Sequence, residues 1–300
     1  MKKIKLGIIG ISKGNGHPYS WSAIINGYDK KKIKDCGFSV IPKYLNKKIY
    51  PRDFINNAKV SHIWTQNIKI SKKIASTTYI PNIVKKKEHL IGKVDGILLA
   101  RDDYKNHYKI SKPFLKAGMP VYIDKPISIN LKNLKKIYNN ENYPGQIFTC
   151  SATRYSKCLS LNEKLKKKVG RINKIFASCS NNWDKYGIHL IEPIIKILFK
   201  NDVPLKFEKY KKFDKNHFLV VWKSKVQTVF IMNRKKNSKI KIEVEGSKGE
   251  VKLYFNDTFE SFKLALKDFI LGIKKKSARS IKSHNFKAIR IIEEVNKLNV

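Results

Sequence analysis

Two separated segments carry the side-chain types that proton transfer requires. Lys125 stands in the tripeptide Asp124-Lys125-Pro126, and a second segment about sixty residues downstream carries Asp184 and His189. A lysine and a histidine brought together between two domains can move a proton while a bound nicotinamide moves a hydride. Histidine suits this role because its reference pKa, about 6.5, lies near neutral pH. The two segments together indicate an oxidoreductase with Lys125, His189 and Asp184 as its candidate catalytic residues.

The composition narrows the class of protein. The chain has 300 residues, which is enough for two domains of ordinary size. Its formal net charge of +41 would suit a protein that binds nucleic acid or an anionic membrane. However, only seven of the 64 basic residues are arginine, the side chain whose planar fork binds phosphate bidentately. We therefore interpret the charge as a lysine-rich composition that attracts anionic substrates and cofactors, and we do not expect a nucleic-acid partner.

Cysteine spacing and hydropathy indicate the compartment. The four cysteines are scattered, with no Cys-x-x-Cys pair and no histidine at metal-ligand spacing. This is typical of reduced thiols in a cytoplasmic protein. No stretch approaches eighteen uninterrupted apolar residues, so we expect no membrane span. Asp102 and Asp103 are adjacent but no second ligand cluster accompanies them, so we predict no metal site.

The first half of the chain alternates strand and helix patterns. An apolar run over residues 4–9 is followed by a glycine- and serine-rich turn and by a helical stretch over 19–26. Strand, glycine turn and helix open a dinucleotide-binding βαβ unit, although the spacing departs from Gly-x-Gly-x-x-Gly. The candidate cofactor-binding residues in this turn are Gly10, Ser12, Gly14, Gly16 and His17.

Further strands in this half place two more candidates. A strand over residues 60–67 ends at Asn67, where a dinucleotide-binding fold usually carries an acid for the adenosine ribose. Strand patterns over 94–100 and 120–123 follow, and the second delivers Asp124-Lys125-Pro126 at its carboxyl end, where open parallel sheets bind ligands. The alternation predicts a doubly wound α/β domain over residues 1–126, with an irregular insertion at about 28–57.

Beyond residue 127 the pattern changes. Strand patterns over residues 146–154, 174–180, 217–232 and 239–246 have few helices between them, while helices are indicated over about 187–199 and 258–271. Strands in succession predict an α+β domain over 127–300 with a large open, mostly antiparallel sheet. Arg154 follows one of these strands and is a candidate to bind an anionic group of a substrate.

The order of these features resembles the Gfo/Idh/MocA family, named after glucose–fructose oxidoreductase, inositol dehydrogenase and rhizopine catabolism. Residues 117–126 resemble that family's Gly-x-x-Val strand and its Glu-Lys-Pro tripeptide, with Asp124 in place of the glutamate. His107 fits the family's histidine early in the preceding helix. Gly187-Ile188-His189 matches the end of an Asp-x-Gly-x-His motif, whose aspartate falls at Lys185, one residue past Asp184.

The resemblance implies a Rossmann domain, a C-terminal α/β domain with an open sheet, and NAD or NADP as the cofactor. It implies that Lys125, in the tripeptide Asp124-Lys125-Pro126, contacts the nicotinamide ribose or the substrate hydroxyl and shuttles the proton. His189 would hydrogen-bond the reacting hydroxyl, and Asp184 would orient His189 or the substrate. Lys185 joins Arg154 as a candidate substrate contact.

These inferences predict an NAD(P)-dependent oxidoreductase that acts on a sugar, nucleotide sugar or polyol. We expect a cytoplasmic homo-oligomer, a dimer or tetramer assembled through the open sheet, with a small carbohydrate-like substrate. A catalytically idle ligand-binding protein is an alternative, because the glycine turn, Asn67 and the shifted aspartate depart from the family pattern. A basic nucleic-acid-binding protein is a second alternative, which rests on net charge alone.

Overall fold

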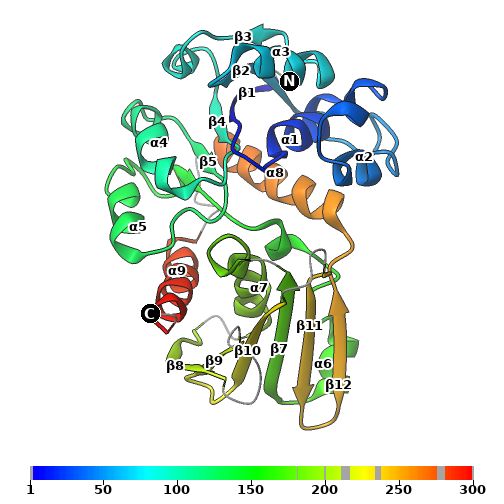
Figure 1. Cartoon of the computed structure of the whole chain (residues 1–300), viewed down its shortest axis with the longest axis vertical. Helices are drawn as coiled ribbons and strands as arrows, with labels where there is room; N and C mark the ends of the chain where they lie inside the picture. Colours follow the sequence, from blue (N-terminus) through cyan, green and yellow to red (C-terminus); the bar gives the residue numbers. More distant parts are fainter. Residues whose placement is uncertain are drawn as a thin grey trace. The chain divides into compact units, whose positions relative to one another are not determined.

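The computed structural model describes residues 3–180, 182–198, 201–210, 217–233, 238–275 and 281–298. The chain forms two compact units, each with its own sheet (Figure 1). The first unit comprises Met1–Ser128, Lys132–Cys150 and Phe262–Ile281, and the second comprises Ile129–Leu131, Ser151–Ser261 and Lys282–Val300. The units follow the order of the proposed domains 1–126 and 127–300, but the first unit also takes in two later segments.

The first unit is built on a six-stranded sheet in the order β3-β2-β1-β4-β5-β6. All neighbouring strands run parallel, and the strand order reverses between β1 and β4, where doubly wound sheets bind their ligands. Every residue of β4 is buried, as expected for a parallel strand covered on both faces. The predicted Rossmann sheet is confirmed. Its strands are β1 (Ile4–Gly10), β2 (Ala58–Thr65), β3 (Asn82–Ile83), β4 (Gly96–Leu99), β5 (Val121–Ile123) and β6 (Ile147–Phe148).

Helix α8 (Thr258–Lys275) joins the first unit from far along the chain. The ring of Phe269 lies 5.7 Å from the rings of both Tyr122 in β5 and Phe148 in β6. The helix itself follows the predicted pattern, but the sequence analysis placed it in the second domain. The other helices of this unit are α1 (His17–Asn26), α2 (Val40–Leu45), α3 (Ile68–Thr77), α4 (His107–Lys116) and α5 (Leu131–Tyr138).

The segment over residues 28–57 contains regular structure. It forms the short 3-10 helix η1 (Lys32–Asp35) and helix α2, and it has its own apolar contacts. Ile33 and Leu45 are fully buried, and Ile55 is almost so. The expectation of an irregular insertion is therefore wrong in its local structure, since this segment contributes side chains to the core of the first unit.

The second unit carries a six-stranded sheet in the order β12-β11-β7-β10-β9-β8. Only β7 and β10 pair in parallel, so the predicted mostly antiparallel α+β arrangement is confirmed. The strands are β7 (Ile172–Ser180), β8 (Pro204–Lys209), β9 (His217–Trp222), β10 (Gln227–Asn233), β11 (Lys241–Gly246) and β12 (Glu250–Tyr254).

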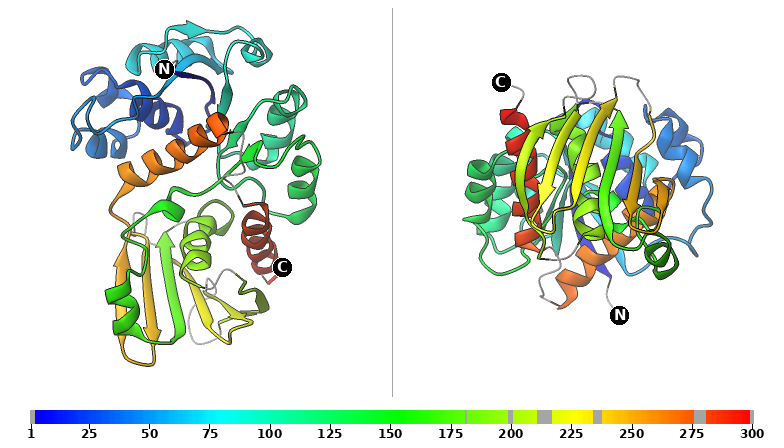
Figure 2. Two further views of the ribbon diagram at one scale, coloured as in Figure 1. Left: turned by 180° about the vertical axis from the view of Figure 1, so that it is seen from behind. Right: turned by 90° about the horizontal axis from the view of Figure 1, so that it is seen from below.

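One face of this second sheet is covered by helices and the other is more open. In β7 the buried residues Ile175, Ala177 and Cys179 alternate with half-exposed ones, which is the period-two pattern of a sheet covered on one side. Helix α7 packs on β7 and β10, as Figure 2 allows the reader to follow from two sides. The helices of this unit are α6 (Glu163–Val169), α7 (Trp183–Ile197) and α9 (Lys282–Lys297). None of the helices within the described ranges is both long and apolar enough to span a membrane.

Candidate active site

Glycines shape the loop that joins β1 to α1 in the first unit. A Cβ atom on Gly10 would lie 2.4 Å from Cγ of Pro18, and one on Gly16 would lie 2.6 Å from Cδ1 of Ile41. Gly14 has a φ of +81° with open space around it, a conformation that side chains rarely adopt. The backbone therefore approaches its neighbours more closely at positions 10 and 16 than any larger residue would allow.

The same loop offers unpaired backbone donors. Across the part of the chain that the structure describes, the N–H groups of Lys13, Gly14 and Gly16 donate to no protein oxygen. The first turn of α1 offers fewer, because Pro18 has no N–H and the N–H of His17 donates to Oδ1 of Asn15 at 2.7 Å. A phosphate held here would therefore be bound mainly by the loop, with the helix N-terminus contributing its dipole.

Side chains fasten this loop to the neighbouring strand ends. The Ser12 hydroxyl donates to Oδ1 of Asp102 at 2.5 Å and accepts from the Asp102 N–H at 3.1 Å. The Gln66 amide pairs with the backbone of Ile11, accepting from its N–H at 3.1 Å and donating to its carbonyl at 2.7 Å. These bonds tie the carboxyl ends of β1, β2 and β4 together. The sequence analysis missed the role of Gln66, since no spacing rule marks it.

Asp124 is the anchor of the site. Its carboxylate is fully buried and accepts three hydrogen bonds, from Nδ2 of Asn15 at 2.8 Å, Nδ1 of His17 at 2.5 Å and the backbone N–H of Lys125 at 2.7 Å. Burial alone raises the pKa of this carboxyl, but the interactions with His17, Lys125 and Asn15 outweigh burial and hold the pKa below its usual 3.8. The glycine loop and the segment after β5 are therefore joined through one ionised carboxylate.

His17 is held on both sides at the start of α1. Its ring stacks on Trp21 at 5.0 Å between centroids and meets Phe262 edge-on at 5.2 Å. Its side chain is 17% exposed, and Asp124 fixes its Nδ1. His17 and Asp124 form an imidazole–carboxylate pair at the carboxyl edge of the sheet. The sequence named both residues as cofactor-binding candidates but did not indicate that they bind each other.

Lys125 follows β5 directly, and its residue is 9% exposed. A lysine this deeply enclosed is uncommon, since the ammonium group loses most of its hydration. Asn67 lies two residues beyond β2, at the strand end that the sequence predicted. Its side chain accepts from the Lys69 N–H at 2.9 Å and so caps helix α3.

His189 lies in α7 of the second unit, where a hydroxyl pair orients it. Its Nδ1 is 2.6 Å from the Oγ of Ser151, a residue that is fully buried. The same Oγ lies 2.7 Å from Oγ1 of Thr153 and accepts from the Thr153 N–H at 3.2 Å. Ser151 was missed by the sequence analysis, which searched for a carboxylate partner of His189 close to it in the chain.

Asp184 faces elsewhere. Its Oδ1 accepts from Nδ2 of Asn296 in α9 at 2.8 Å, so the structure does not show the expected orientation of His189 by this carboxylate. The reason is helical geometry, because residues five apart lie about 140° apart around an α-helix, whereas residues four apart share a face. Lys185, four residues before His189, therefore shares its face and is half-buried.

Arg154 is engaged inside the second unit. Its Nε and one terminal nitrogen bind the two carboxylate oxygens of Glu192, and the same terminal nitrogen donates to Oδ1 of Asn285 at 2.9 Å. Glu192 is buried, and burial raises its pKa although Arg154 opposes this. The expectation that Arg154 binds a substrate anion is therefore not supported, because its guanidinium already neutralises a buried carboxylate.

A family model described as "Oxidoreductase family, NAD-binding Rossmann fold" matches residues 36–151. The matched stretch begins just after η1, runs through β6 and contains the tripeptide Asp124-Lys125-Pro126, whereas β1, the glycine loop and α1 lie before it. Residues 36–151 are thus similar to the Gfo/Idh/MocA oxidoreductases. The resemblance drawn from the motifs is thereby confirmed for the stretch that carries the tripeptide, and the matching family is described as NAD-binding.

Solved structures of dehydrogenases share the fold over nearly the whole chain. They include myo-inositol 2-dehydrogenase from Lactobacillus plantarum (TM-score 0.73, 13% identity, covering 99% of this chain and 97% of that one). They also include myo-inositol dehydrogenase from Lactobacillus casei in complex with NAD(H) and myo-inositol (0.73, 14%, 99% and 94%) and a probable dehydrogenase from Thermotoga maritima (0.71, 15%, 98% and 96%). At these identities the likeness shows that this chain shares their fold. A search of curated protein sequences finds no match.

The described residues contain no group of three or more His, Cys, Asp or Glu side chains that could hold a metal ion. The polar groups of the Rossmann unit instead fit a dinucleotide. A loop with three unpaired N–H groups and an open Gly14 suits a pyrophosphate, and the half-enclosed His17 lies next to that loop.

Proposed function

We propose that the protein is an NAD(P)-dependent dehydrogenase or reductase that acts on a sugar, nucleotide sugar or polyol. The observation that carries this proposal is the enclosed Lys125 at the carboxyl end of β5, fastened through Asp124 to the glycine loop within a family-matched Rossmann unit. When bound, the nicotinamide supplies the hydride chemistry. The chain supplies the orientation of the reactants and the handling of the proton.

Lys125 is the proposed proton shuttle to the substrate hydroxyl, with His189 of the second unit as its helper. If the Ser151 hydroxyl donates to Thr153, its lone pairs accept from Nδ1 of His189, and the other ring nitrogen is left as an acceptor. That tautomer can accept a hydrogen bond from an alcohol. If Ser151 instead donates to Nδ1, the other nitrogen carries the proton and favours a carbonyl substrate.

The cofactor side of the proposal is NAD or NADP. Asn67 caps α3 and carries no charge, so this position neither repels a 2′-phosphate nor offers a carboxylate to a 2′-hydroxyl. The Lactobacillus casei neighbour was solved with NAD(H) and myo-inositol, which supports a dinucleotide and a polyol as the first ligands to test.

The test is turnover with NAD⁺ and with NADP⁺ over a panel of polyols and sugars that includes myo-inositol, followed through the absorbance of the reduced nicotinamide. Lys125→Met should keep cofactor affinity and lower kcat by about 10²–10⁴, the usual worth of a positioned proton donor. Lys116→Met, at an exposed position at the end of α4, is the matched control and should leave turnover unchanged. Normal turnover in Lys125→Met would remove the mechanism.

A catalytically idle binding protein remains the second candidate, favoured by the pairing of Asp184 with Asn296 rather than with His189. Trp21 is the natural reporter for this question, since it stacks on His17 at the start of α1. Quenching of tryptophan fluorescence by NADH or NADPH with no turnover on any substrate of the panel would favour the idle protein.

We also propose a cytoplasmic homo-oligomer assembled through the open face of the second sheet. Half-exposed Phe176 of β7 and Leu219 of β9 flank Val229 of β10 there, and Val229 itself is buried. Light scattering of the wild type and of Leu219→Lys tests this assembly, and a variant with the wild-type mass would refute it.

A further inference from the structure

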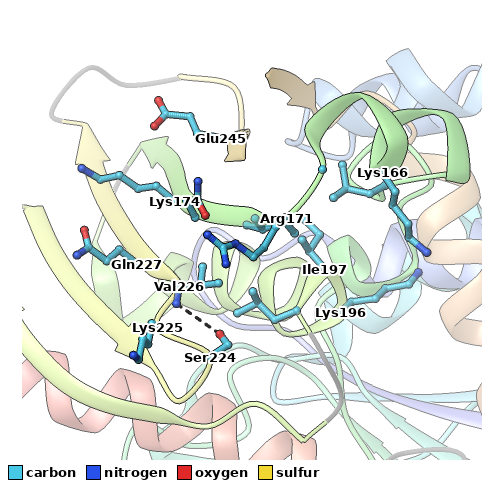
Figure 3. A pocket seen from close by; sticks show the side chains of 15 residues that line it. Lys166, Arg171, Lys174, Lys196, Ile197, Ser224, Lys225, Val226, Gln227 and Glu245 are labelled. Atoms are coloured by element: carbon cyan, nitrogen blue, oxygen red, sulfur yellow. Dashed lines mark hydrogen bonds between the residues drawn. The ribbon is translucent and has the colours of Figure 1, made fainter. Parts of the chain in front are cut away.

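A cavity lies within the second unit, at the end of its sheet where β7 and β10 begin. Its volume is about 1030 Å³, which is the size of a small-molecule site. The first residues of β7 and β10, the last turn of α7 and helix α6 form its walls, as Figure 3 shows. Nothing in the proposed dehydrogenase reaction uses this cavity.

The cavity is separate from His189. Helix α7 begins just after β7 ends, so its C-terminal residues return to the start of that strand. Lys196 of α7 lines the cavity, seven residues beyond His189, which corresponds to roughly 10 Å along the helix axis. Neither His189 nor Ser151 contributes to the lining.

The cavity carries five basic side chains and one acidic side chain. Lysine is abundant throughout this chain, so the number of lysines in the cavity is weak evidence for an anionic ligand. The arginine is stronger evidence, because arginine is rare in this chain. Figure 3 shows Arg171 between Lys174 and Lys225 on one side and Lys166 and Lys196 on the other. The acidic side chain is Glu245. The cavity therefore presents a net positive charge around an arginine.

The guanidinium of Arg171 has no ion-pair partner among the described residues, whereas Arg52, Arg101 and Arg154 each bind a carboxylate. Among the described residues, Arg290 on α9 likewise forms no ion pair, and Arg171 differs from it in lining the cavity. Its planar fork is free to bind the oxygens of an anion in two places.

Two neighbouring lysines hydrogen-bond to neutral groups, although Asp257 also acts on Lys196 electrostatically and Glu245 stands opposite Lys174 in the sheet. Nζ of Lys174 donates to the hydroxyl of Tyr210 at 3.3 Å, and Nζ of Lys196 donates to the backbone carbonyl of Arg154 at 3.1 Å. Both partners are neutral oxygens, which orient an ammonium group without cancelling its charge. Lys166 differs, because it pairs with Glu163 on the surface of α6.

Lys225 occupies the turn between β9 and β10 with a φ of 69°. This left-handed conformation costs a residue with a Cβ atom about 1 kcal/mol, and glycine or asparagine would adopt it more easily. The hairpin itself requires this conformation, since the Lys225 N–H donates to the Trp222 carbonyl at 2.8 Å and the Trp222 N–H donates to the Val226 carbonyl at 2.9 Å. The turn therefore places the Lys225 ammonium group at the rim of the cavity.

The floor of the cavity is apolar. Val226 and Leu198 are buried there, and Ile172 is half-buried. An apolar floor below a cationic rim favours a ligand that combines an apolar body with a small anionic group carrying several oxygens, such as a phosphate. We propose that this cavity binds a phosphorylated small molecule with an apolar or aromatic body, and that Arg171 is its principal phosphate contact.

The test is calorimetric titration of the full-length protein with 1-naphthyl phosphate. Arg171→Gln should weaken binding about tenfold or more, because a charge-assisted bidentate contact is lost. Arg290→Gln removes the same charge from an exposed position on α9 and is the matched control. Lys225→Gln should weaken binding, whereas Lys223→Gln, two residues away in the same turn, should not. Uncharged 1-naphthol should bind at least tenfold more weakly than the phosphate.

Three results would overturn the proposal. One is the absence of binding to the wild type at millimolar concentrations of the probe. Another is equal weakening by Arg171→Gln and Arg290→Gln, which would mean that the probe follows net charge or occupies the dinucleotide site. The third is tighter binding of a short single-stranded RNA that Arg171→Gln also abolishes, because the ligand would then be a nucleic acid. Melting temperatures of all four variants show whether each is folded.

Discussion

Replacing Asp124 by asparagine should destabilise the first unit by between about 1.5 and about 6 kcal/mol. The carboxylate accepts two hydrogen bonds on Oδ2, from Asn15 and His17, and one on Oδ1, from the Lys125 N–H. An asparagine can keep an oxygen at only one of these two positions, so its NH₂ group faces the donors on the other side. If the oxygen stays at Oδ1, two bonds to a charged group are lost, each worth about 1.5–3 kcal/mol. The lower limit applies if His17 exchanges its ring proton and accepts from the new amide.

The loss should also depend on pH. The folded-state pKa of Asp124 is lowered, so its contribution to stability is fully present above the unfolded-state pKa of about 4. The contribution disappears as the pH falls through the lower folded-state pKa. The difference in unfolding free energy between wild type and variant should therefore be constant from about pH 5 upward and should shrink below about pH 4.

The assay is urea unfolding followed by tryptophan fluorescence and extrapolated linearly to water at several pH values. Asp35→Asn is the matched control, since Asp35 is exposed, and it should change the free energy by no more than about 0.5 kcal/mol. A loss below about 1 kcal/mol at pH 7 in Asp124→Asn, or a loss that stays constant down to about pH 2, would refute this account of the anchor.

Three further outcomes follow from contacts in the two units. Ser151→Ala should lower kcat and displace the pH–rate limb set by His189, while in a double variant with His189→Ala its effect should vanish, because both act through one ring; fully additive effects would contradict this. Asn67→Asp should keep the cap of α3 and shift cofactor preference toward NAD(H), as measured by the ratio of the two dissociation constants, because the new carboxylate repels a 2′-phosphate; an unchanged ratio would place Asn67 away from the ribose. Arg154→Ala should cost about 3–5 kcal/mol in urea unfolding, since it leaves buried Glu192 without its counter-charge; a loss below about 1 kcal/mol would show that Glu192 is not ionised.

The elements of the fold were largely predictable from the sequence because their signals are local. The alternation of buried and half-exposed residues in β7 and the short apolar runs of β1 and β4 can be recognised from neighbouring residues in the sequence. Helix α8 was predicted from its apolar face, but the sequence did not show that its residues from Phe262 onward pack in the first unit. Its contacts with Tyr122 and Phe148 join residues more than a hundred positions apart, and no periodicity reports such a destination.

The partners of polar side chains were the least predictable part of the site. The residue types at positions 184 and 154 suggested a catalytic and a substrate-binding role. Instead, Asp184 binds Asn296 and Arg154 binds Glu192, and both partners are distant in the sequence. Ser151 carried no signal, since serine is common on surfaces and its hydrogen bond to His189 depends on tertiary packing. By contrast, Ile41 and Leu45 are four residues apart, a spacing visible in the sequence that could have indicated helix α2.

The single carboxylate at Asp124 has a consequence for how the cofactor preference of this protein could change. It supports the glycine loop through Asn15 and His17 and also supports the backbone at Lys125. A substitution in the glycine loop therefore also disturbs Lys125, the residue proposed to move the proton. Dinucleotide affinity and turnover should rise or fall together in such variants. Among the described residues, the side chain of Asn67 hydrogen-bonds only at the start of α3, and its backbone bonds Thr65 at the end of β2. Substitutions at the end of β2 should therefore change the cofactor preference with less loss of turnover than substitutions in the glycine loop.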